Sequence, residues 1–120
     1  MSENAKWLSK NKVADAVTEY FETEAVTFAD PLECDCTLGV NFTTTITGNT
    51  TVNLTNLEDG MSGVITLTND VGGAHTLAFG AAFTSLQNGS DAYDDTGDAI
   101  NIIDWSYDGT NVYYRLINIL

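Results

Sequence analysis

The amino-acid sequence predicts an all-β fold: an antiparallel β-sandwich, jelly-roll-like, with an N-terminal helical or extended arm. Short runs in which apolar and polar residues alternate occupy most of the chain after residue 31. Glycine-containing turns separate these runs. Threonine, whose branched Cβ favours strands, is concentrated between residues 43 and 55. We therefore expect two units, an arm over residues 1–31 and a β-sandwich over residues 32–120.

The length and the hydropathy limit the class of protein. At 120 residues the chain is the size of one domain with a single core. No apolar run approaches the roughly 20 residues that a membrane-spanning helix needs. The first residues, MSENAKWLSKNK, carry charge without the apolar segment of a secretion signal. We therefore expect a protein made in the cytoplasm and no membrane partner.

The charge is strongly acidic and unevenly distributed. Seventeen acidic residues oppose four basic ones, which gives a net charge of −13. Residues 1–12 sum to +2, from three lysines against Glu3, and the remaining residues sum to −15, from Arg115 against sixteen acids. A body this acidic repels nucleic acid and anionic lipid, so neither is an expected partner. The acidity either keeps the protein soluble or accompanies a basic arm that docks onto an acidic partner.

The arm begins with a helical pattern. Apolar residues recur at intervals of three and four residues between positions 7 and 21, which predicts an amphipathic helix. Its apolar stripe packs on its own domain or docks onto a neighbouring subunit, and the pattern favours neither. The residues that we expect to dock are Lys6, Trp7, Leu8, Lys10, Lys12 and Val13.

The next run contains both cysteines. Residues 32–38 alternate, so Leu32, Cys34, Cys36 and Leu38 are expected on one face. Adjacent residues on one face of a strand seldom reach disulfide geometry. A zinc site is also not expected, because no histidine and no second cysteine pair lies nearby. We predict two reduced, partly buried thiols.

Three hairpins are expected after this run. Residues 41–47 and 50–55 would pair across Gly48-Asn49, with Phe42, Ile46, Val52 and Leu54 in the core. A second hairpin would form around Gly72-Gly73, between the runs at residues 65–68 and 76–79. Residues 100–107 and 112–120 would close the body on an Asp108-Gly109 turn. Both faces of this last pair are apolar, which suits a central strand or a subunit interface.

Chemical signals are weak. Residues 91–98 hold four aspartates, and oxygen ligands of this kind bind calcium, but a solvated acidic loop is favoured because the spacing matches no EF-hand. His75 is the only histidine, and acid–base catalysis would need a nucleophile or carboxylate held beside it. No serine or cysteine motif supports catalysis, so a turn-exposed or packing role is favoured. Exposed tyrosines and tryptophan could form a sugar platform, although a core or interface role is favoured. We expect no enzyme activity, no metal and no cofactor.

Four motifs together resemble a β-module that recurs in bacteriophage virion proteins. They are an alternating run with a G-N-T-T turn at residues 41–51, the SGVITL run at 62–67, GGAHTLAFG at 72–80, and a strand pair around a D-G turn at 105–114. The resemblance covers roughly residues 35–120. Every motif in it is a turn or a core pattern, so it implies a fold and a virion setting rather than a chemistry.

The resemblance implies a structural role in the virion, after synthesis in the host cytoplasm. The expected function is binding to the outer surface of a capsid, as a decoration, cement or head-fibre protein. The expected partner is the major capsid protein or another virion protein, and the expected state is a homotrimer. The alternative is a receptor-binding tail-fibre or adhesin module in which residues 87–97 and the tyrosines contact host glycan. The expected trimer interface comprises Trp105, Tyr107, Tyr113 and Arg115.

Overall fold

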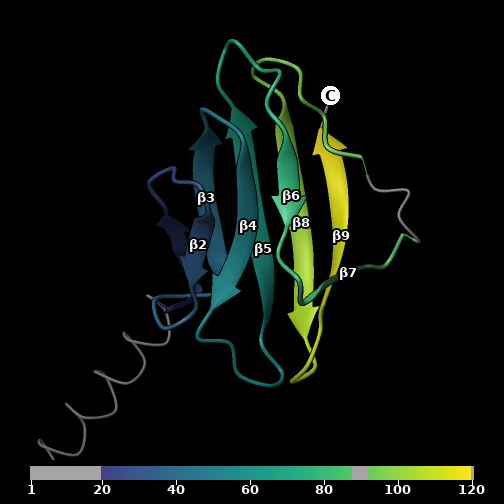
Figure 1. Cartoon of the computed structure of the whole chain (residues 1–120). Helices are drawn as coiled ribbons and strands as arrows, with labels where there is room; N and C mark the ends of the chain where they lie inside the picture. The colour runs from purple at the N-terminus through teal and green to yellow at the C-terminus, as the bar shows by residue number, and fades with distance from the viewer. Residues whose placement is uncertain (1–19, 88–91, 120) are drawn as a thin grey trace, which may run out of the picture.

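In the computed structural model, which describes residues 20–87 and 92–119, the chain forms two β-sheets around one core (Figure 1). The larger sheet has the strand order β1-β3-β5-β8-β9-β7, and the smaller has the order β2-β4-β6. The chain is therefore all-β, as expected. The strands are β1 Thr23–Ala25, β2 Leu32–Asp35, β3 Asn41–Ile46, β4 Thr50–Thr55, β5 Ser62–Asn69, β6 Leu77–Phe79, β7 Phe83–Ser85, β8 Ile100–Tyr107 and β9 Val112–Ile119.

The first six strands alternate between the two sheets. Odd-numbered strands β1, β3 and β5 pair in parallel in the larger sheet, and β2, β4 and β6 pair in parallel in the smaller one. The chain thus winds through three successive coils, each with one strand in each sheet, as in a β-solenoid. The larger sheet then continues with an antiparallel order, because β8 pairs with β5 and β9 pairs with β8. Strand β7 runs parallel to β9 at the far edge.

Hydrogen bonds between successive coils hold the corners where the chain crosses from one sheet to the other. The Thr50 amide donates to the carbonyl of Thr76 at 3.1 Å, and the Thr50 hydroxyl donates to the carbonyl of Ala29 at 2.7 Å. On the neighbouring corner the Asp70 amide donates to the carbonyl of Ile46 at 3.0 Å. The corners therefore satisfy their backbone polar groups against one another, as the strands do.

The core lies between the sheets and follows the two-residue period of the strands. Buried side chains come from alternate positions of β3, β5, β8 and β9 on one side and of β2 and β4 on the other. The predicted core residues Phe42, Ile46 and Val52 are all buried, and Leu54 is half-buried against them. Fully buried members from both sheets include Leu32, Cys34, Ile65, Leu67, Ile103 and Val112.

Strand pairing corrects part of the prediction. Five of the seven strand pairs are parallel, which differs from the antiparallel, jelly-roll-like sandwich that the sequence predicts. The two hairpins expected around Gly48 and around Gly72 are wrong, because β3 and β4, like β5 and β6, lie in different sheets. A three-residue connection spans about 10 Å, which is also the usual spacing between packed sheets. A connection of this length can therefore join two strands of one sheet as a hairpin, or carry the chain from one sheet to the other.

Two further expectations have clear outcomes. The closing hairpin is confirmed, because β8 and β9 pair antiparallel from Ile100↔Ile119 to Tyr107↔Val112. Leu38 is not on the buried face, because β2 ends at Asp35 and the chain turns there, which leaves Leu38 56% exposed. Of the expected arm, residues 1–19 lie outside the described residues, whereas residues 23–25 form β1 of the larger sheet.

Gly63 marks the closest approach between two coils. A Cβ at this position on β5 would lie 1.9 Å from the carbonyl oxygen of Val40, just before β3. That oxygen belongs to the backbone, so it cannot move aside as a flexible side chain could. Only glycine lets β5 pack at this distance from the preceding connection.

We therefore predict that Gly63→Ala lowers the free energy of unfolding by about 2 kcal/mol or more, because the strands must separate to admit the methyl group. Urea denaturation followed by circular dichroism measures the change. Gly72→Ala is the matched control, since a Cβ there meets only the Asp70 carboxylate, at 3.8 Å. Equal losses in the two variants would contradict the close-approach explanation.

Candidate functional site

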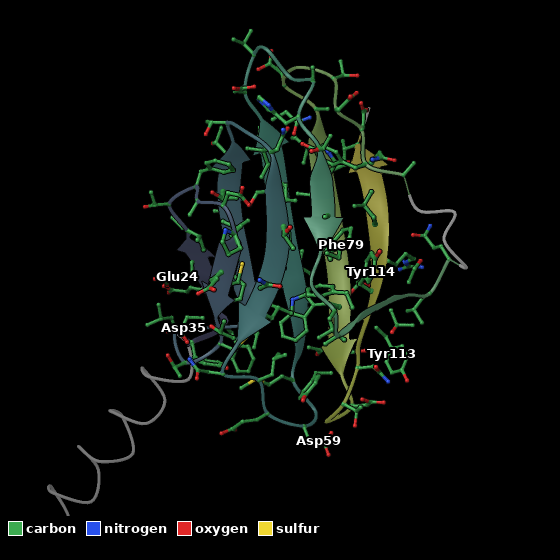
Figure 2. The ribbon with its side chains drawn as sticks, viewed as in Figure 1. Glu24, Asp35, Asp59, Phe79, Tyr113 and Tyr114 are labelled. Atoms are coloured by element: carbon green, nitrogen blue, oxygen red, sulfur yellow. The ribbon has the colours of Figure 1, made fainter. Side chains whose placement is uncertain are left out.

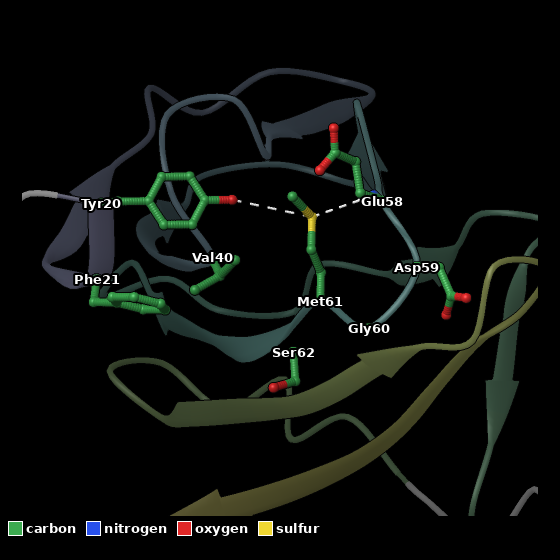
Figure 3. A pocket seen from close by; sticks show the side chains of 8 residues that line it. All are labelled: Tyr20, Phe21, Val40, Glu58, Asp59, Gly60, Met61 and Ser62. Atoms are coloured by element: carbon green, nitrogen blue, oxygen red, sulfur yellow. Dashed lines mark hydrogen bonds between the residues drawn. The ribbon is translucent and has the colours of Figure 1, made fainter. Parts of the chain in front are cut away.

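The structure describes a pocket beside Tyr20, the first of the described residues (Figure 3). The expected docking residues Lys6, Trp7, Leu8, Lys10, Lys12 and Val13 lie outside the described residues, so the described chain begins at this pocket. The pocket has a volume of about 400 Å³. It is lined by Tyr20, Phe21, Val40, Glu58, Asp59, Gly60, Met61 and Ser62.

Tyr20 and Phe21 fasten the start of the described chain to both sheets. The Tyr20 hydroxyl donates to the carbonyl of Cys36 at 2.7 Å, and Asn41 Nδ2 donates to the carbonyl of Phe21 at 3.0 Å. The two rings meet edge to face with centroids 5.5 Å apart. Burial raises the pKa of Tyr20, and the nearby Cys36 and Glu58 raise it further, so the hydroxyl stays a donor at neutral pH.

The opposite wall comes from the connection between β4 and β5. The Met61 sulfur accepts from the Glu58 amide at 3.3 Å and lies 4.0 Å from the Tyr20 hydroxyl (Figure 3). Glu58 and Asp59 add carboxylates, and the described lining contains neither a basic residue nor a nucleophile–base pair. An open hollow with apolar and acidic groups suits an apolar or cationic side chain. Tyr20 and Phe21 end the apolar pattern that predicts a helix between positions 7 and 21, whereas no sequence pattern indicates a role for Met61.

The expected interface residues separate into two groups. Trp105 is 2% exposed, so it belongs to the core and is not available to another subunit, contrary to the prediction. Tyr107 is half-buried, and its hydroxyl donates to the carbonyl of Gly109 in the closing turn at 2.8 Å. Tyr113 and Arg115 lie on the outer face of the larger sheet, where Arg115 Nη2 is 3.4 Å from Asp104 Oδ2. The register explains the difference, because Trp105 pairs with Tyr114 on the inner face.

Aromatic rings do not assemble into a sugar platform among the described residues. Tyr114 stacks on Phe79 with centroids 4.3 Å apart, and both rings contact Phe83 between the sheets (Figure 2). The Tyr93 hydroxyl donates inward to Asn69. Trp105 is in the core. The rings that glycan contact would use are thus two buried ones, Trp105 and Tyr114, and three half-buried ones, Tyr93, Tyr107 and Tyr113.

Buried asparagines hold the acidic loop against the end of the larger sheet. Asn69 Nδ2 donates to the carbonyls of Asp94 and Thr96, each at 2.8 Å. Asn101 accepts from the Asp94 amide at 2.9 Å and donates to the Asp94 carbonyl at 3.0 Å. The Asp94 carboxylate accepts from the Thr96 side chain and amide, and these bonds lower its pKa. This loop therefore caps the end of the sheet through hydrogen bonds, and the Asp94 carboxylate already has a protein partner in Thr96.

His75 pairs with Asp70, with 3.1 Å between Nε2 and Oδ1, and the Gly73 amide donates to the same carboxylate oxygen at 3.0 Å. The pair closes the β5–β6 connection, and it places a carboxylate beside this histidine that the sequence pattern did not indicate. Among residues 20–87 and 92–119, no group of histidine, cysteine, aspartate and glutamate side chains could hold a metal ion. In the same ranges, no helix is long and apolar enough to span a membrane.

Comparisons with protein-family models, with curated proteins and with solved structures find no significant match.

The asparagine network generates a prediction. Asn101→Ala removes both bonds to Asp94 and leaves the part-buried Asp94 amide without its side-chain acceptor, so we expect a loss of about 1–3 kcal/mol in unfolding free energy and faster proteolysis within residues 92–99. Urea denaturation and limited proteolysis measure the two effects. Asn111→Ala is the control, because Asn111 contacts Asp108 through its backbone amide. Unchanged proteolysis in the Asn101 variant would show that the network does not hold the loop.

The cysteines generate a prediction about pH. Both are free and buried, and burial raises the pKa of Cys34 to about 12 and that of Cys36 to about 11. An unfolded thiol ionises near pH ~8.5, so the unfolded chain loses these protons first as the pH rises. The stability that the two thiols contribute is therefore complete below about pH 8 and is lost between about pH 9 and about pH 12.

We expect urea denaturation to show this fall, and the Cys34→Ala/Cys36→Ala double variant to show a shallower one. Alkylation at about pH 8 should modify both thiols in urea and neither in the folded protein. Rapid alkylation of the folded chain would contradict the burial.

Proposed function

We propose that this chain is a virion structural protein that binds the outer surface of a bacteriophage capsid as a decoration, cement or head-fibre protein. The observation that carries the proposal is the separation of charge between a basic start and an acidic body. The resemblance of residues 35–120 to virion β-modules agrees with it. The function is adhesive, and the partner is the major capsid protein or another virion protein.

The charges of the body support an arm-mediated contact. Arg115 is the only basic residue of the chain beyond residue 12, and it pairs with Asp104. The other acidic side chains of the described body have no lysine or arginine to neutralise them. A partner with acidic surface would therefore meet repulsion from the body and attraction from Lys6, Lys10 and Lys12.

The pocket supports the same arrangement at the root of the arm. Tyr20 and Phe21 are hydrogen-bonded to Cys36, just after β2, and to Asn41 of β3, so the residues that follow the arm are fixed to the body. Apolar side chains of the arm, such as Trp7 and Leu8, would bury surface on the shell at ~25 cal/mol per Å². Repeated copies on a symmetric particle would multiply weak contacts into avidity. The expected homotrimer stays a prediction.

The glycan-binding alternative has less support. It needs a cluster of exposed rings beside polar groups, and most of the candidate rings pack inward among the described residues. No separate observation favours it over the capsid contact.

Deleting residues 2–19 should abolish binding to shells of the major capsid protein from the same phage, because it removes the lysines and the apolar stripe while keeping Tyr20. Co-sedimentation measures binding, and circular dichroism verifies that the body stays folded. Replacing Lys6, Lys10 and Lys12 with alanine tests the charge, and Trp7→Ala/Leu8→Ala tests the apolar contact. Undiminished sedimentation of the deletion variant would refute the role of the arm.

A further inference from the structure

The outer face of the larger sheet has an unusual composition. It consists of the side chains of β3, β5, β8 and β9 that alternate with the buried ones and therefore point away from the smaller sheet. The strand register aligns them in rows across the four strands. One row is Thr43, Thr66, Ile102 and Ile117, and the next is Thr45, Thr68, Ile100 and Ile119.

Charge is almost absent from this face. Asp104 is the only acidic residue on it, and its charge is balanced by Arg115 in the adjoining strand at 3.4 Å. The remaining acidic residues of the described chain lie in loops, at the edge strand β1 and on the smaller sheet. In a chain of net charge −13, a four-stranded face with no net charge is a marked departure from the rest of the surface.

Four isoleucines on β8 and β9 form an apolar patch on this face, and Asp94 and Asp98 of the acidic loop border the patch at Ile119. Ile117 and Ile119 are 40% and 46% exposed, and their partners Ile100 and Ile102 on β8 are half-buried beside them. Burial of four isoleucine side chains in contiguous positions favours association. The threonine half continues this surface with methyl groups and hydroxyls, so the whole face can pack against another sheet at the usual spacing of about 10 Å.

We infer that this face, the outer face of β3, β5, β8 and β9, is the surface through which copies of this chain associate. The charges favour a second copy of this chain as the partner that binds this face. Two bodies this acidic repel each other wherever acidic surfaces meet, and this face lets them approach without bringing net charge together.

The area of this face indicates how tightly two copies would associate. Four strands are about 19 Å wide and eight residues are about 27 Å long, so the face covers about 500 Å² per copy. Two copies would bury about 1,000 Å² in total, which is near the lower limit for a specific interface. The association is therefore weak, in the micromolar range or above, and it becomes effective where copies are concentrated on one assembly. This inference does not depend on the capsid proposal.

The test is the oligomeric state of the full chain. Sedimentation equilibrium from low to high micromolar concentration should show a mass that rises from 12.9 kDa towards a multiple of it. Added salt should strengthen the association, because it screens repulsion between acidic bodies and leaves the apolar contact intact. A dimer or a trimer supports the inference. A monomer at every concentration would overturn it, and so would an oligomer that salt dissociates, which would indicate basic arms bound to acidic bodies.

Variants locate the contact. Ile117→Lys should weaken association at least about tenfold, because it would bury an unpaired charge. Thr45→Arg, at an exposed position on the threonine half, provides a second variant with little risk to folding. Val71→Lys is the matched control, since Val71 is an apolar residue 83% exposed in the β5–β6 connection. Equal association of the wild type and both face variants would place the contact elsewhere and refute the inference.

Discussion

The structure depends on the burial of alternate side chains between two sheets that the chain visits in turn. Each of the first three coils supplies inward residues from one strand of each sheet, so no coil can cover its apolar face without the next. Phe42 from β3, Val52 from β4 and Ile65 from β5 meet in this way. The close approach at Gly63 and the corner bonds at Thr50 are consequences, because they bring successive coils near enough to exclude water.

Two antiparallel strands, β8 and β9, extend the larger sheet beyond the three coils. Strands β8 and β9 lie beside β5 and widen the larger sheet, and they place Trp105 and Tyr114 over the end of the shared core. Aromatic packing of Tyr114 on Phe79 then joins the two sheets on this side. The asparagine pair Asn69 and Asn101 lies towards the opposite end of the larger sheet and holds the acidic loop there. The larger sheet thereby acquires a broad outer face with no layer of its own chain assigned to it among the described strands.

Charged residues are distributed unevenly over the molecule. The acidic residues belong mainly to the body, the lysines lie within the first twelve residues, and the outer face of the larger sheet has no net charge. The proposed attraction to an acidic partner and the inferred contact between copies would therefore use different parts of the chain.

The strand content, most of the core and the closing hairpin were predictable from the chain, because a two-residue alternation and an Asp108-Gly109 turn are local properties. The charge of the first twelve residues was predictable in the same way. The three-dimensional arrangement selected the sheet that receives each strand, since a connection as short as residues 47–49 can form a hairpin or a crossing equally well. It likewise decided that Trp105 faces inward while Ile117 faces outward: alternation defines two faces, and the position of the opposite sheet selects the buried one.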